Sequence, residues 1–170
     1  PGDLIFLRGE TAEPSVLDPL ASAPTIRAIA HWQLSSFAVD RWAPSADGTV
    51  VAAELEGREC PSDVFVMRTD GSGLRRPFEA DDRSATVPMW APDGSRLIAF
   101  GVPWPPPPGP HFARPPSTLL AWDPATNTTM DLGRPCSACQ PAGGVAWSPD
   151  SSRIAVDYTE LVRQKQETQN

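Results

Sequence analysis

At 170 residues, of which 40% are hydrophobic, the chain is long enough to bury a core of its own. It carries 14 Lys and Arg against 21 Asp and Glu, a net charge of -7, and its only basic cluster is the "LRR" at 74–76. This balance argues against a surface for nucleic acid or for an anionic membrane. The sequence contains no run of eighteen apolar residues, so we expect no membrane span.

Proline and glycine punctuate the whole chain. The 21 prolines and 12 glycines lie between short apolar runs, a pattern that predicts many strands joined by turns. We expect a helix only around Thr25–Ser36 and from Glu160 onward. Because the chain starts at Pro1 rather than Met, we also expect it to be either a processed product or a segment of a longer protein.

Two sequence patterns recur along the chain. An apolar run that ends in a turn starts at Asp3 ("DLIFLRG"), at Asp63 ("DVFVMRTDGSG") and at Thr118 ("TLLAWDPATN"). Between these runs stands a tryptophan with a proline–aspartate turn and a second apolar run. Its copies are "WAPSADGTVVAAE", "WAPDGSRLIAF" and "WSPDSSRIAVDY", which begin 48 and 57 residues apart. A period of about fifty residues predicts a repeat architecture.

The middle copy of the repeat gives the clearest view of one unit. Residues 85–90 and 96–102 predict two strands around the turn "APDGS", in which Pro92 presets φ and Gly94 is free to adopt a positive φ. Residues 62–68 and 74–79 predict a third and a fourth strand, joined by "TDGSG". We expect these four antiparallel strands to form one small sheet.

The inner strands do not alternate apolar and polar residues. "LIAF" at 97–100 and "RIAV" at 153–156 are apolar at consecutive positions, which is typical of strands covered on both faces. Small sheets stacked face to face around an axis meet this need, so we predict an all-β fold of the β-propeller type. The tryptophans fill the gaps between adjacent sheets in this interpretation. The structural repeat residues are then Trp42, Trp90, Pro92, Asp93, Gly94, Trp147, Pro149 and Asp150.

"DVFVMRTDGSGLRRPF" followed by "VPMWAPDGSRLIAF" resembles the TolB-type, WD-like β-propeller repeat. The resemblance is strong over residues 63–100, good over 145–158 and weaker over 1–54. "WAPSADG" has two extra residues and "WSPDSS" lacks the glycine, so we expect these two turns to differ in shape from the middle one.

We expect residues 1–160 to form about three blade equivalents of four-stranded antiparallel sheets, with limits near 1–57, 58–116 and 117–160. Residues 161–170 are expected to form a polar tail, disordered or in a short helix. Closed propellers have about four to eight blades. Three arrangements therefore stay open: a piece of a longer six- to eight-bladed protein, a homodimer that completes a six-bladed ring, or an open stack capped by insertions.

The proline-rich loop "GVPWPPPPGPHFARPPS" at 101–117 is the most unusual segment. Such a run favours polyproline II, either as a stiff spacer or as a ligand for aromatic grooves. If it is a recognition loop, its partner-binding residues are Trp104, His111, Phe112 and Arg114; otherwise it is a plain surface insertion.

The three cysteines are Cys60, Cys136 and Cys139. "CSAC" at 136–139 has the C-x-x-C spacing of redox and zinc sites, but neither a second such pair nor an H-x-x-x-H motif is present to complete a zinc site. We favour a local Cys136–Cys139 disulfide or plain thiols, and we expect no metal and no cofactor.

Catalytic motifs are absent from the sequence: it holds no G-x-S-x-G, no H-E-x-x-H and no P-loop. We predict a non-catalytic module that presents loops to a protein or peptide partner. The alternative is the substrate-gating propeller of a prolyl-oligopeptidase-like or tricorn-like serine peptidase whose catalytic domain lies outside this chain. A carbohydrate-binding or lyase propeller would need clustered His, Tyr and acidic residues, and Tyr158 is the one tyrosine. The family resemblance implies a bacterial, extracytoplasmic location: periplasmic, secreted, or on the outer part of a membrane-anchored protein.

Overall fold

The computed structural model describes residues 4–8, 13–17, 27–28, 37–57, 62–70, 72–79, 83–105, 117–134 and 139–160. Within these ranges every regular element is a β-strand and no residue lies in a helix, so the predicted all-β class is confirmed. Of the two segments for which a helix was expected, Arg27–Ala28 and Glu160 lie in strands, and the remaining residues are outside the described ranges. The described residues form no helix that is long and apolar enough to cross a membrane.

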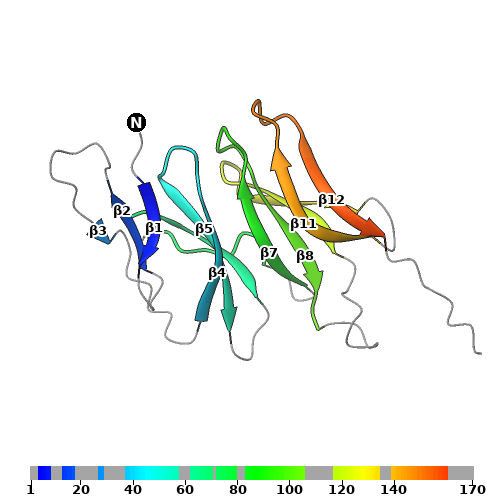
Figure 1. The fold of residues 1–170 in the computed structure, drawn as a ribbon, viewed down its shortest axis with the longest axis horizontal. Helices are drawn as coiled ribbons and strands as arrows, with labels where there is room; N and C mark the ends of the chain where they lie inside the picture. The colour runs from blue at the N-terminus through cyan, green and yellow to red at the C-terminus, as the bar shows by residue number, and fades with distance from the viewer. Residues whose placement is uncertain are drawn as a thin grey trace, which may run out of the picture.

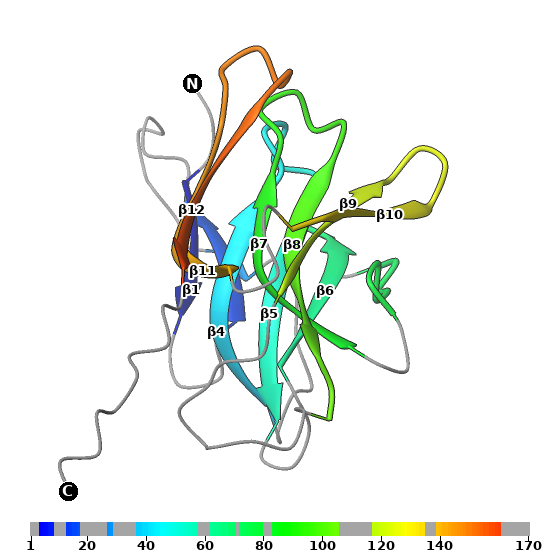
Figure 2. The ribbon, with the colours of Figure 1, turned by 90° about the vertical axis from the view of Figure 1, so that its right-hand side faces the viewer.

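The strands form four antiparallel sheets that stand side by side in a row (Figure 1). Within each sheet the strands pair in chain order. Figure 2 views the row from the end where β11 and β12 lie in front. The first sheet contains β1 (Leu4–Arg8), β2 (Glu13–Leu17) and β3 (Arg27–Ala28); the second β4 (Phe37–Pro44), β5 (Val50–Gly57) and β6 (Asp63–Arg68); the third β7 (Arg83–Trp90), β8 (Leu97–Pro103), β9 (Thr118–Asp123) and β10 (Thr128–Gly133); the fourth β11 (Cys139–Trp147) and β12 (Ile154–Glu160).

The grouping of strands differs from the one predicted for the middle repeat. Residues 62–68 were expected to share a sheet with 85–102, but β6 pairs with β5, and β8 pairs with β9. An isolated bridge from Val66 to Arg75 extends the second sheet further. The boundaries expected between blade equivalents, after residues 57 and 116, therefore fall inside the second and third sheets. A sequence repeat fixes the period but not where a sheet begins, because each strand can pair with the strand before it or the strand after it.

Neighbouring residues of β8 face different cores, as predicted for a strand covered on both sides. Leu97 and Ala99 pack toward the second sheet, while Ile98 and Phe100 pack toward the fourth. The first core joins Ala52, Val64, Val66 and Phe78 to Ala85, Trp90, Leu97, Ala99, Leu120 and Trp122. The second joins Ile98, Phe100, Leu119 and Ala121 to Val87, Met89, Val145, Trp147, Ile154, Val156 and Tyr158.

Trp90 lies between the second and third sheets and is only 8% exposed. Its Nε1 donates a hydrogen bond across the gap to the backbone oxygen of Ala43 (3.1 Å), and its ring meets Trp122 edge to face, with the centroids 6.1 Å apart. Trp147 packs in the same way against the third sheet, but its buried Nε1 has no hydrogen-bond partner.

Trp42 does not take the place of Trp90 in the first copy of the repeat. In the strand pairing, Trp90 stands opposite Leu97, and the matching residue of the second sheet is Pro44, opposite Val51. Trp42 stands two residues further from the turn, opposite Ala53. The two extra residues of "WAPSADG" therefore shift the tryptophan along the strand and leave its side chain on the same face.

The three tryptophan-associated turns share one shape, so the predicted differences between them are wrong. In each turn the backbone N–H of the opening residue donates a hydrogen bond of 2.8 Å to the backbone oxygen of the residue five positions on. The backbone oxygen of the opening residue accepts a hydrogen bond of 2.9 Å from the backbone N–H of the residue three positions on. Gly48 and Gly94 adopt φ of 69° and 72°, and Ser151 adopts 58° at the equivalent position. The missing glycine of "WSPDSS" is replaced by a serine that accepts the left-handed conformation. The opening residues are Ser45, Ala91 and Ser148.

Exchanging each tryptophan for phenylalanine should separate the inter-sheet hydrogen bond from ring packing. Both variants lose part of an indole that packs against the neighbouring sheet, but only Trp90→Phe leaves a backbone oxygen without its donor. We expect Trp90→Phe to lower the free energy of unfolding by about 1 kcal/mol more than Trp147→Phe. Urea denaturation of both variants measures the difference, and equal losses would show that the bond to Ala43 adds nothing.

Candidate functional site

Of the four residues predicted for the recognition loop, the structure describes only Trp104. Trp104 directly follows β8 and is 42% exposed. His111, Phe112 and Arg114 lie outside the described residues, as does Cys136. Cys139 begins β11, where its backbone pairs with Glu160, and nothing is described of its side chain. The recognition loop and the disulfide therefore stay predictions.

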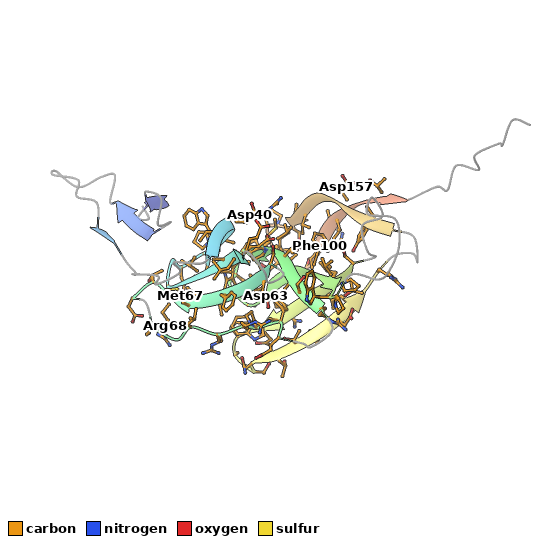
Figure 3. The ribbon with its side chains drawn as sticks, turned by 90° about the horizontal axis from the view of Figure 1, so that it is seen from below. Asp40, Asp63, Met67, Arg68, Phe100 and Asp157 are labelled. Carbon is orange, nitrogen blue, oxygen red and sulfur yellow. The ribbon has the colours of Figure 1, made fainter. Side chains whose placement is uncertain are left out.

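A pocket of about 200 Å³ opens at the opposite end of the sheets, where the tight turns lie. It lies between the second and third sheets, with Val50, Val66 and Met67 on one side and Trp122 and Pro124 on the other. Figure 3 shows Met67 and Arg68 at the end of β6. Thr49, Arg68, Gly73 and Arg75 complete its lining.

Arg75 is held in place from two sides. Its backbone exchanges two hydrogen bonds of 2.9 Å with Val66, and its guanidinium carbon lies 5.9 Å from the centre of the Trp122 ring. Its Nη1 donates to the side-chain oxygen of Asn127 (3.4 Å), which also accepts a bond from Trp122 Nε1 (3.3 Å). A guanidinium has five N–H donors, so this arrangement presents a positioned cation over an aromatic wall.

Aspartates cap the tight turns at this end of the sheets, two of which, around Asp70 and Asp123, lie beside the pocket. The Ser72 hydroxyl and backbone N–H hold the pKa of Asp70 below its ordinary value, and the backbone N–H groups of Thr126 and Ala125 do the same for the pKa of Asp123. In the last turn the hydroxyls of Ser148 and Ser152 lower the pKa of Asp150 to about 2. These carboxylates are occupied by the donors of their own turns. Asp47 and Asp93 play the same part in the remaining two turns.

Glu54 is the buried carboxyl group that links two sheets. It lies on β5, is 5% exposed, and its Oε2 accepts the backbone N–H of Val87 at 2.9 Å. Val87 sits where the register of β7 shifts and has a φ of 56°, which is rare for a β-branched residue. Burial raises the pKa of Glu54 above its ordinary value. The observed bond gives this group a structural role, since it anchors the irregular backbone of the neighbouring sheet.

Within the described ranges, no group of three or more His, Cys, Asp or Glu side chains is arranged to hold a metal ion. The candidate site is therefore the pocket beside Arg75. Sequence reasoning placed Trp122 in an apolar run and Arg75 in a predicted strand, and it singled out neither. The two residues are 47 positions apart, and nothing in the sequence signals that they stack.

No protein-family model matches the sequence, and no curated protein matches it. Several solved structures resemble the chain, among them an oligogalacturonate lyase and a TolB protein. An oligogalacturonate lyase in complex with manganese matches with a TM-score of 0.52 and 19% identity, covering 84% of this chain and 34% of the lyase. TolB from Acinetobacter baumannii matches with a TM-score of 0.48 and 14% identity, covering 85% of this chain and 34% of TolB.

Both of these proteins are β-propellers, and the likeness to the lyase supports a propeller fold for this chain. At 19% identity it shows the fold alone. The chain spans 34% of the length of each of these two structures.

Replacing Glu54 with Gln should change how stability depends on pH. The raised pKa means that the folded chain keeps a proton which the unfolded chain releases above the ordinary value of 4.5. The stability of the parent chain should therefore fall as the pH rises through the window between 4.5 and the higher folded pKa, and then level off. Glu54→Gln lacks this loss, so its stability relative to the parent should rise as the pH rises through the same window, as measured by urea titrations. Glu79→Gln is the control, because Glu79 is exposed and is not among the groups that shift the pKa of Glu54. Identical pH profiles for Glu54→Gln and the parent would contradict the prediction.

Proposed function

We propose that this chain is part of a β-propeller scaffold that binds a protein or peptide partner without catalysing a reaction. In this proposal the pocket beside Arg75 receives one acidic side chain of the partner. The observation that carries the proposal is the positioned Arg75 guanidinium at a small, partly apolar pocket between two sheets.

The size of the pocket favours a protein partner. Sites for small molecules and cofactors usually enclose about 300–1,000 Å³. A pocket of about 200 Å³ is smaller and suits a single side chain. Protein interfaces commonly concentrate their binding energy in such pockets, where one anchor residue is fully desolvated.

The chemistry of the pocket favours a carboxylate on that anchor. Arg76 and Arg83 form ion pairs within the chain, with Asp63 and Asp131. The side chain of Arg75 instead hydrogen-bonds to a neutral amide. A partner carboxylate would receive charge-assisted bonds from this guanidinium, and the walls of Val50 and Val66 would cover the methylenes of the same side chain.

Replacing Arg75 with Ala should remove this recognition. A peptide library displayed on phage and selected against the 170-residue chain should yield sequences that share an acidic residue beside an apolar one. We expect the selected peptides to bind Arg75→Ala at least about tenfold more weakly, as measured by calorimetry, because a charged hydrogen bond contributes about 1.5–3 kcal/mol. Arg153→Ala is the matched control: Arg153 is exposed in the turn of the fourth sheet, away from the pocket, and should bind like the parent.

Two results would count against the proposal. One is a selection that yields no common acidic position. The other is a set of peptides that bind Arg75→Ala and the parent equally well.

The location of the protein is part of the same proposal. The family resemblance implies a place outside the bacterial cytoplasm, where disulfides persist. We predict that Cys136 and Cys139 are bonded when the protein is purified from its native source. Mass spectrometry after alkylation without a reducing agent should then show both cysteines unmodified and linked, whereas two alkylated thiols would contradict the prediction.

A further inference from the structure

The fourth sheet has one covered face and one exposed face. On the covered face Tyr158 meets Phe100 of the third sheet edge to face, with the ring centroids 6.4 Å apart. Gly144, Ala146, Ala155, Asp157 and Thr159 lie on the other face and are exposed. Figure 3 shows Asp157 on the last sheet of the row.

The corresponding face of the second sheet is covered by the third sheet, and its residues match those of the exposed face of the fourth. The shared turn geometry aligns Ala155 with Ala52 and Asp157 with Glu54. On the fourth sheet Ala146 stands opposite Ala155, and on the second sheet Ala43 stands opposite Ala52. An alanine pair followed by a carboxylate two residues on is therefore present on both sheets.

The second sheet shows what this arrangement holds. Trp90 of the third sheet lies over the alanine pair and donates its Nε1 hydrogen to the oxygen of Ala43. Glu54 accepts the backbone N–H of Val87 from the same neighbouring strand. Small side chains let the indole approach the backbone, and the carboxylate satisfies a donor that a bulged strand would otherwise leave unpaired.

The third sheet provides the contrast. Its corresponding pair is Met89 and Ile98, and Phe100 occupies the position of Glu54. Trp147 packs over this larger pair, and its buried Nε1 has no partner. An alanine pair accompanies a bonded tryptophan, and a bulky pair accompanies an unbonded one.

We propose that the exposed face of β11 and β12 is the docking surface for another sheet of the same repeat. A tryptophan of that sheet lies over Ala146 and Ala155 and donates to the oxygen of Ala146. A backbone N–H of its bulged first strand donates to Asp157. The occupant is therefore a tryptophan-bearing antiparallel sheet.

A second copy of this chain fits the surface less well. The tryptophans that precede the turns of its third and fourth sheets, Trp90 and Trp147, are already packed within the chain. In its second sheet Pro44 occupies the corresponding position. The described strands of its first sheet contain no tryptophan, so the proposed occupant is a sheet of additional repeat sequence.

The test extends the full chain at Asn170 with a second copy of residues 80–134, so that the chain's own last ten residues form the linker. Hydrogen–deuterium exchange is then followed over residues 144–160. We expect exchange on β11 and β12 to slow at least about tenfold relative to the unextended chain. Replacing the appended Trp90 with Phe should recover most of the fast exchange.

Substitutions on the docking surface give the controls. Ala155→Arg should abolish the slowing and Asp157→Ala should weaken it, while Ala125→Arg, at an exposed position in the β9–β10 turn, should leave it unchanged. Unchanged exchange in the extended chain, or slowing that persists in Ala155→Arg, would overturn the proposal. Sedimentation of the unextended chain gives an independent reading: a dimer that Ala155→Arg dissociates would make a second copy the occupant, and the proposal would fall.

Discussion

The indole of Trp90 is the contact on which the packing of the second and third sheets depends. Backbone hydrogen bonds pair the strands within each sheet, but adjacent sheets meet almost entirely through side chains. Trp90 contributes both a large buried ring and a hydrogen bond to a backbone oxygen 47 residues earlier in the chain. A buried N–H that finds such a partner avoids the cost of desolvation, so the bond favours one distance between the two sheets.

The spacing set by Trp90 also shapes the pocket. Trp90 meets Trp122 edge to face, and Arg75 stacks over the same Trp122 ring. Asn127 accepts from both Trp122 and Arg75, which couples the turn of the third sheet to the second. The candidate site is thus built on the inter-sheet core, and a change in the sheet spacing would separate its two walls.

The sequence predicted the kind of structure better than the assignment of strands to sheets. The consecutive apolar residues at Leu97–Phe100 predicted a strand buried on both faces, because a strand with one face in water would alternate apolar and polar residues. The prediction that Trp42 is equivalent to Trp90 was wrong, because two extra residues move Trp42 along the strand without changing its face. Only the pairing of Pro44 with Val51 reveals the shift. The stacking of Arg75 on Trp122 could not be predicted, because it depends on the register between two sheets rather than on local pattern.

Differences between the repeats carry as much information as their likeness. The turns tolerate replacement of glycine by Ser151, since one residue can accept a left-handed conformation at a modest cost. The sheet faces are less tolerant of such differences. The third sheet has Met89 and Ile98 where the second has an alanine pair, and the tryptophan that packs over them, Trp147, makes no hydrogen bond through its Nε1. The third sheet also has Phe100 in the position of Glu54, so it offers no carboxylate to accept an N–H from a bulged strand. The residues on each sheet face therefore suit the sheet that covers that face. Two sheets that carry the same residues on this face should accept the same kind of neighbour. The alanine pair and carboxylate of β11 and β12 specify a tryptophan-bearing neighbour for this reason.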